Sequence, residues 1–106
     1  MNNEEFVLTV DECIVKCKRI LNKKGKDYST DEDRFSNFYS AAGLQSNSPE
    51  QALFGMLAKH LVAINDFIDE DANGGTVLKK DWEDKIFDAI NYLFLLQGIL
   101  KEKGSM

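Results

Sequence analysis

Residues 84–97, DKIFDAINYLFLLQ, constrain the fold more than any other part of the chain. Their side chains are apolar almost all the way round a helix, and such a helix is buried on most sides. Asp84, Asp88 and Asn91 nevertheless follow one another at spacings of four and three, which aligns them along one side of that helix. Burying a carboxylate costs several kcal/mol unless a cation, a metal ion or hydrogen-bond donors meet it. The segment therefore predicts a central helix with a binding site along its polar line. The alternative is that the two aspartates face solvent and Asn91 pairs with a neighbouring helix.

Length and composition fit one globular domain over residues 1–106, with 43% apolar and 29% charged residues. No apolar run reaches the ~18 residues of a membrane span, so no contact with a membrane is expected. The start, MNNEEF, is acidic and lacks the features of a signal peptide, which predicts a cytoplasmic location. A net charge of −5 disfavours binding to duplex nucleic acid.

The first helix is predicted from a capping-box pattern. Thr9 followed by Glu12 has the spacing in which two side chains satisfy the free backbone groups of a helix start. The predicted helix runs from Val10 to Lys23. It ends before Gly25, because glycine favours the backbone conformations that terminate helices.

A second helix carries its apolar face on aromatic residues and alanine, and its start has two alternative caps. Ser29 with Glu32, or Thr30 with Asp33, has the required spacing. Gly43 is the natural stop of this helix.

The third and fourth helices are the longest. Ser48, Pro49 and Gln51 combine a capping serine, a proline at the first helical position and a glutamine at the third. The helix that follows is predicted to end near Asp69, and a fourth helix is predicted over residues 80–101.

These elements define an all-α, four-helix bundle-like domain in which the two longest helices form an antiparallel hairpin. The fourth helix has apolar side chains on more sides than three small helices can cover. The excess predicts a homo-oligomer. The side chains concerned are Phe87, Tyr92, Phe94 and Leu95.

Residues 23–38 bring lysines, an arginine, a glycine and several aromatic side chains together. Nucleotides need cations for phosphate and a flat apolar surface for the base, so this run is a candidate nucleotide site. The alternative is an exposed basic turn followed by a core helix. His60, the single histidine, is either a ligand contact or a core-edge group. The candidate ligand-binding residues are Lys24, Lys26, Asp27, Tyr28, Arg34, Phe38, His60, Asp88 and Asn91.

Four motifs, read in order, resemble a known group of proteins. They are Lys-Gly-Lys-Asp-Tyr, Asp-Arg-Phe-Ser-Asn-Phe, an Ala-Lys-His helix and Asp84-x-x-x-Asp88-x-x-Asn91-Tyr92. Over residues 20–97 the chain resembles small phage and prophage nucleotide-modification-associated domain proteins, which are distantly similar to all-α MazG-like pyrophosphohydrolases. The resemblance implies a helical, oligomeric protein and, in MazG-like enzymes, Mg²⁺-dependent cleavage of nucleoside triphosphates between the first two phosphates.

The chain departs from the MazG-like pattern in its acidic residues. Lys85 stands three residues before Asp88, where those enzymes carry a glutamate, and the third helix has no clear glutamate pair. Fewer carboxylates make a weaker metal site. The departure favours binding over hydrolysis.

Three functions stay open at this point. The expected one is a phage-type protein that binds a nucleotide or nucleotide-derived signal molecule without a cofactor, in the host cytoplasm, and sequesters it against host defence. The alternative is a Mg²⁺-dependent nucleoside triphosphate pyrophosphohydrolase with Asp66, Asp84 and Asp88 as metal ligands. The third is a protein-interaction inhibitor module with no small ligand.

Overall fold

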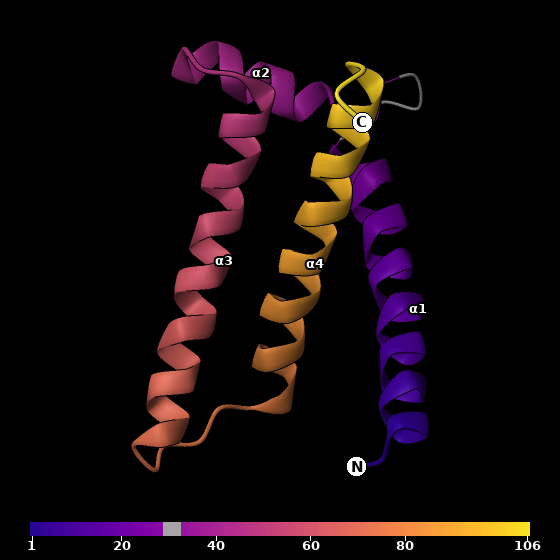
Figure 1. The fold of residues 1–106 in the computed structure, drawn as a ribbon. Helices are drawn as coiled ribbons and strands as arrows, with labels where there is room; N and C mark the ends of the chain where they lie inside the picture. Colours follow the sequence, from indigo (N-terminus) through magenta and orange to yellow (C-terminus); the bar gives the residue numbers. More distant parts are fainter. Residues whose placement is uncertain (29–32) are drawn as a thin grey trace.

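A computed structural model describes the backbone of residues 1–28 and 33–106 and the side chains of residues 1–25 and 33–106. This part of the chain consists of four helices and contains no strand, which confirms the all-α class. The helices are α1 (Asn3–Tyr28), α2 (Ser36–Gln45), α3 (Pro49–Ala72) and α4 (Lys79–Glu102). The helices α3 and α4 form the predicted antiparallel hairpin, and α2 crosses one end of it (Figure 1).

The start of α3 is the predicted one. The Ser48 hydroxyl accepts from the Gln51 backbone N–H at 3.1 Å, while the Gln51 side chain accepts from the Ser48 N–H at 2.9 Å. Pro49 occupies the first turn, where its missing N–H costs nothing. The helix ends at Ala72, three residues beyond the predicted end, and both ends of α4 lie within one residue of the prediction.

Both predicted ends of α1 are wrong. The helix begins at Asn3, where the Asn2 side chain accepts from the Glu5 N–H at 2.8 Å and so provides the cap. Thr9 lies inside the helix, and its hydroxyl donates to the Glu5 carbonyl at 3.0 Å. Gly25 does not stop the helix. A β-carbon there would lie 2.7 Å from Arg34 Nε, so the glycine makes room for the arginine.

The predicted ends of α2 differ as well. The carboxylate of Asp33 accepts from the Phe35 N–H at 3.0 Å just before the helix. The helix runs past Gly43 and ends at Gln45. Ser46 is its C-cap and has a left-handed φ of 54°. The predicted cap residues Ser29, Thr30 and Glu32 lie outside the described residues.

The core lies where α2 crosses the hairpin. The buried cluster consists of Phe38 from α2, Leu53 from α3 and Ile99 from α4, and five partly buried residues pack against it. The Phe35 ring comes so close to α4 that a β-carbon on Gly98 would meet it at 2.5 Å. Glycine at this position therefore permits the close approach of the segment before α2 to α4.

The three long helices lie side by side in one layer (Figure 1). The helix α4 packs against α3 on one side and against α1 on the other, and α1 and α3 share no comparable contact. The radius of gyration is 15.9 Å, compared with about 13 Å for a compact domain of this length. No helix in the described part of the chain is both long enough and apolar enough to span a membrane.

Candidate functional site

A cavity of about 370 Å³ lies between the C-terminal half of α1, the start of α2 and the hairpin. Six of the predicted ligand-binding residues line it, although they are spread over 68 positions of the sequence. They are Lys24, Arg34, Phe38, His60, Asp88 and Asn91; the other lining residues are Leu21, Asn37, Met56, Tyr92 and Leu95. The volume lies near the lower end of the range for small-molecule sites.

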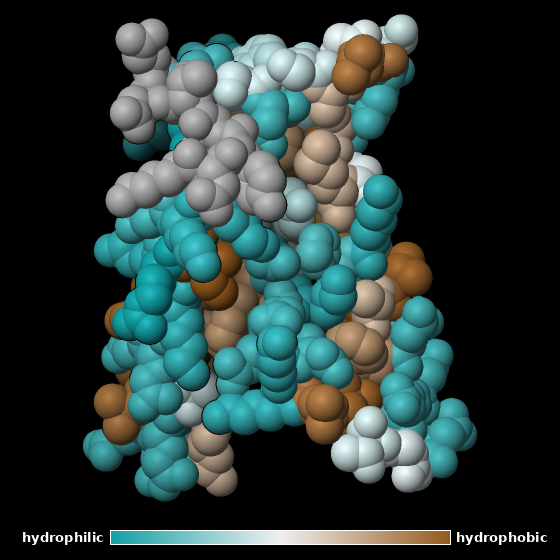
Figure 2. All heavy atoms as spheres, turned by 180° about the vertical axis from the view of Figure 1, so that it is seen from behind, coloured by the Kyte–Doolittle hydropathy of each residue, from teal (hydrophilic) through white to brown (hydrophobic). Residues whose placement is uncertain are grey.

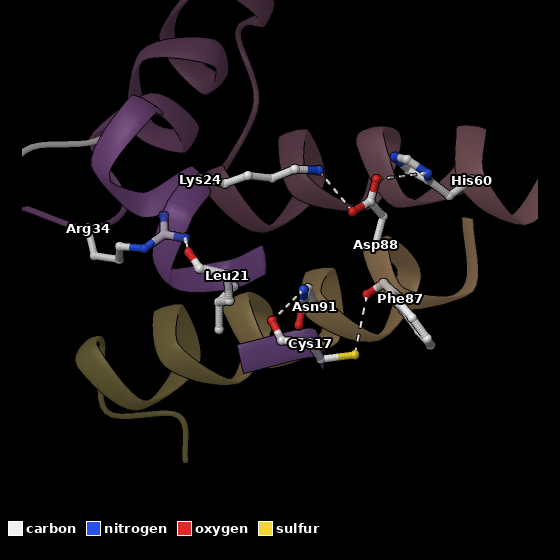
Figure 3. A network of polar contacts seen from close by, with 8 residues as sticks. All are labelled: Cys17, Leu21, Lys24, Arg34, His60, Phe87, Asp88 and Asn91. Atoms are coloured by element: carbon white, nitrogen blue, oxygen red, sulfur yellow. Dashed lines mark hydrogen bonds and ion pairs between the residues drawn. The ribbon is translucent and has the colours of Figure 1, made fainter. Parts of the chain in front are cut away.

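Asp88 connects three helices in this cavity. Its carboxylate accepts from the Lys24 ammonium of α1 at 2.9 Å, and its second oxygen lies 4.0 Å from His60 Nδ1 of α3 (Figure 3). The Lys24 side chain is half exposed, so this pair contributes at most ~1 kcal/mol to stability. Its main effect is to hold a lysine and a carboxylate at fixed positions in the cavity wall.

His60 is held in its neutral form. Burial lowers the pKa of the imidazole from its ordinary value of 6.5; the charge of Asp88 opposes this shift, and Lys85 and Lys24 add to it. At 4.0 Å, the contact with Asp88 is too long for a hydrogen bond. The ring lies 5.2 Å, between centroids, from that of Tyr92, whose own pKa is raised by burial. The imidazole and the phenol form an aromatic wall at the hairpin.

Asn91 has a fixed orientation. Its side chain is only 5% exposed, and its amide nitrogen donates to the Cys17 carbonyl of α1 at 3.0 Å (Figure 3). Because the nitrogen must face that carbonyl, the amide oxygen is left as an acceptor. Asn91 is thus buried and pairs with a neighbouring helix, which is what the alternative interpretation of the polar line expects for this residue.

Three buried side-chain atoms in the described part of the chain have no hydrogen-bond partner: Asn37 Oδ1, His60 Nδ1 and Asn91 Oδ1. All three belong to residues that line the same cavity. Each unpaired buried group costs about 1–3 kcal/mol, and folded proteins contain few of them. Their concentration at one place makes the wall of this cavity a candidate binding site.

Arg34 contributes a second cation. Its guanidinium donates to the Leu21 carbonyl at 3.3 Å, near the C-terminal end of α1 (Figure 3). Burial lowers the pKa of this group, but a guanidinium stays charged at neutral pH. With Lys24 and Asp88 the cavity wall carries one excess positive charge, which favours an anionic ligand.

The acidic residues suggested for a metal are not gathered at this cavity. Asp84 is exposed, as the solvent-facing alternative expects; it borders a second cavity of about 700 Å³ together with Asp81 and Asp88. The physical reason is that α1 and α3 leave the first turns of α4 uncovered on this side. Asp66 is exposed and lines neither cavity. No group of three metal-ligating side chains occurs among the described residues, and the metal role of these aspartates stays a prediction.

Some site residues carry no clear sequence signal, and others are not described. Lys26, Asp27 and Tyr28 have side chains outside the described part, so their predicted roles stay predictions. Asn37 stands between Ser36 and Phe38 in the Asp-Arg-Phe-Ser-Asn-Phe motif, but nothing in its spacing predicts that its amide oxygen is buried. The apolar lining residues are ordinary core residues in the sequence, and only the packing of the helices brings them to the cavity.

Comparison of the chain with protein-family models, with curated proteins and with solved structures gives no match. The function of the cavity is therefore inferred from its own geometry and charge.

Proposed function

We propose that the protein binds a nucleotide or a nucleotide-derived signal molecule in the cavity between α1, α2 and the hairpin. The observation that carries this proposal is the presence of three unpaired buried polar atoms in the same wall as two cations. Two of those atoms are amide oxygens, which only accept hydrogen bonds. Amino and imino groups of a nucleobase donate them, and phosphate oxygens accept from lysine and arginine.

The apolar part of the wall suits a base as well. Phe38 and Tyr92 offer aromatic surface, and stacking of a base on such a ring contributes about 1–3 kcal/mol. A volume of about 370 Å³ lies near the lower end of the range for small-molecule sites. One nucleoside with a short phosphate fits this size better than a dinucleotide does.

The site holds its ligand without needing a metal ion or a covalent step. The histidine is neutral, and the carboxylate nearest to it is paired with Lys24. A protein that binds a nucleotide unchanged lowers the free concentration of that nucleotide. Sequestration of a host-defence messenger is one use of such binding, as the sequence resemblance implies.

The experiment is a thermal-shift panel of nucleoside mono-, di- and triphosphates and cyclic dinucleotides, with and without Mg²⁺, followed by chromatography of any ligand found. A ligand at about 100 times its Kd adds roughly 2.7 kcal/mol of stability. Recovery of the unchanged compound supports binding. Recovery of a monophosphate with Mg²⁺ indicates the pyrophosphohydrolase instead. No shift with any nucleotide contradicts the proposal and leaves the protein-interaction module.

A matched pair of variants tests the location. Lys24→Gln removes a cation of the cavity wall, and loss of one charged hydrogen bond weakens binding by about 10- to 100-fold. Lys80→Gln makes the same chemical change on an exposed residue that lines neither cavity. Equal loss of affinity in both variants would place the ligand elsewhere.

A further inference from the structure

The helix α3 carries two parallel rows of side chains, and only one of them is covered. The inner row contacts α4: Leu53 shares the core cluster with Ile99, and the Phe67 ring lies 5.6 Å, between centroids, from Trp82. The residues that directly follow Leu53 and Phe67 belong to an outer row, whose members are seven residues apart and exposed. We call Phe54, Leu61 and Ile68 the α3 outer row.

The helix α4 has a corresponding outer row. Ile86 and Leu93 are exposed, and Leu100, a further seven residues along, is half-buried; these three form the α4 outer row. At 3.6 residues per turn, Ile86 and Leu93 lie about 160° and 140° around the helix from Asp88. The α4 outer row therefore lies on the side of the layer away from the cavity.

Both rows belong to seams with the alternating spacing of three and four residues that is typical of helices packed in bundles and coiled coils. On α3 the seam is Phe54, Ala58, Leu61, Asn65 and Ile68; on α4 it is Ile86, Ile90, Leu93, Gln97 and Leu100. Leu61 and Leu93 are 47% and 55% exposed in the middle of these seams. Each seam contains one amide side chain, a group that fixes register in coiled coils.

The opposite face has a different character. Seen from behind the view of Figure 1, the surface is mainly hydrophilic and its apolar patches are separate (Figure 2). The cavity residues His60 of α3 and Asp88 of α4 belong to neither seam, and Lys24 comes from α1. The layer thus has a polar side that carries the site and an apolar side that no element of the described chain covers.

The chain exposes more surface than a compact monomer of its mass, and the excess for two chains is as large as the area that obligate homodimers bury. The chain exposes 7570 Å², whereas a compact monomer of 12.0 kDa exposes about 6,000 Å². The excess is about 1,600 Å² for one chain and roughly 3,200 Å² for two. Obligate homodimers bury about 2,000–5,000 Å². The helix α2 covers only one end of the hairpin (Figure 1), so most of the hairpin lacks the second layer of helices that ordinary domains use to form a core.

We propose that the α3 and α4 outer rows pack against the same rows of a second copy of this chain. The product is a two-fold symmetric homodimer in which two hairpins form a four-helix core. A second copy is the occupant with the right properties, because it brings two seams of the same length, spacing and apolar character. The cavity lies on the other side of each layer, so this inference stands independently of the proposed ligand.

Sedimentation equilibrium, supported by light scattering, tests the proposal. The wild type should have twice the monomer mass of 12.0 kDa. Leu61→Glu and Leu93→Glu each place a charge in the middle of a seam and should weaken the dimer at least 100-fold. Leu44→Glu is the matched control, because Leu44 belongs to α2 and to neither seam and is 89% exposed. This variant should stay dimeric.

Circular dichroism shows whether the two seam variants keep their helices. If they unfold, the melting temperature of the wild type decides the question, since a dimer melts at a lower temperature after tenfold dilution and a monomer does not. A wild type that is monomeric at millimolar concentration overturns the proposal. The α3 and α4 outer rows would then be available to bind a different protein. Dissociation by Leu44→Glu equal to that by Leu61→Glu, or a larger assembly unaffected by either seam variant, also overturns it.

Discussion

Asn91→Leu gives the most direct test of the idea that a polar group is kept in the core for binding. Leucine has the same branching as asparagine, with methyl groups in place of the nitrogen and oxygen. The substitution removes the 3.0 Å hydrogen bond to the Cys17 carbonyl, which costs about 1 kcal/mol. It also removes the unpaired Oδ1 of a side chain that is 5% exposed, which raises the free energy of unfolding by about 1–3 kcal/mol. The net change is a gain of about 0–2 kcal/mol for the ligand-free protein.

Urea unfolding of the ligand-free protein measures this change, and a thermal scan should show a melting temperature raised by about 4–8 °C for each kcal/mol. Asn22→Leu, on the exposed side of α1, is the matched control and should change the free energy of unfolding by no more than about 0.5 kcal/mol. The variant should bind nucleotides far more weakly than the wild type. A loss of more than about 1 kcal/mol in Asn91→Leu would refute the reasoning, because Asn91 would then be a structural residue.

Three further predictions follow from the same structure. Leu53→Ala should lower the free energy of unfolding by about 2–5 kcal/mol in urea, because Leu53 is fully buried in the core cluster; a smaller loss would contradict this packing. Burial lowers the pKa of His60 in the folded protein, so the unfolded chain binds more protons below pH ~6.5. The free energy of unfolding therefore decreases as the pH is lowered through this range. The stability advantage of the wild type over His60→Gln should therefore be smaller at about pH 5.5 than at about pH 7.5, and an equal or larger advantage at the lower pH would exclude this origin. Gly25→Ala should displace the Arg34 guanidinium, which lies 2.7 Å from the new β-carbon, and reduce nucleotide affinity in calorimetry without lowering the melting temperature; unchanged affinity would remove Arg34 from the site.

Local signals were reliable where the backbone itself decides the structure. Ser48, Pro49 and Gln51 satisfy the free groups at a helix start, and the predicted capping box forms. The periodic apolar pattern of α4 likewise gave both its ends within one residue. Gly25 and Gly43 were misleading, because a glycine inside a helix costs only about 1 kcal/mol, which does not by itself end the helix.

The candidate site depends on contacts that no local pattern contains. The helical period placed Asp84, Asp88 and Asn91 on one line, but neighbouring helices cover only part of α4. Asn91 is therefore buried, Asp88 is partly covered and Asp84 is exposed. Arg34 and Lys24 were recognised as cations near aromatic residues, but the sequence did not show that they and the polar line share one cavity.

The amino-acid sequence by itself determined that this chain is helical and that its last helix carries polar groups which need partners. Both properties follow from the spacing of side chains along a single helix, which the sequence contains completely. Only the tertiary structure decided that residues of α1, α2, α3 and α4 line one cavity and that the α3 outer row stays exposed. Such contacts join residues up to 74 positions apart, as between Cys17 and Asn91, and depend on how far each helix covers its neighbour.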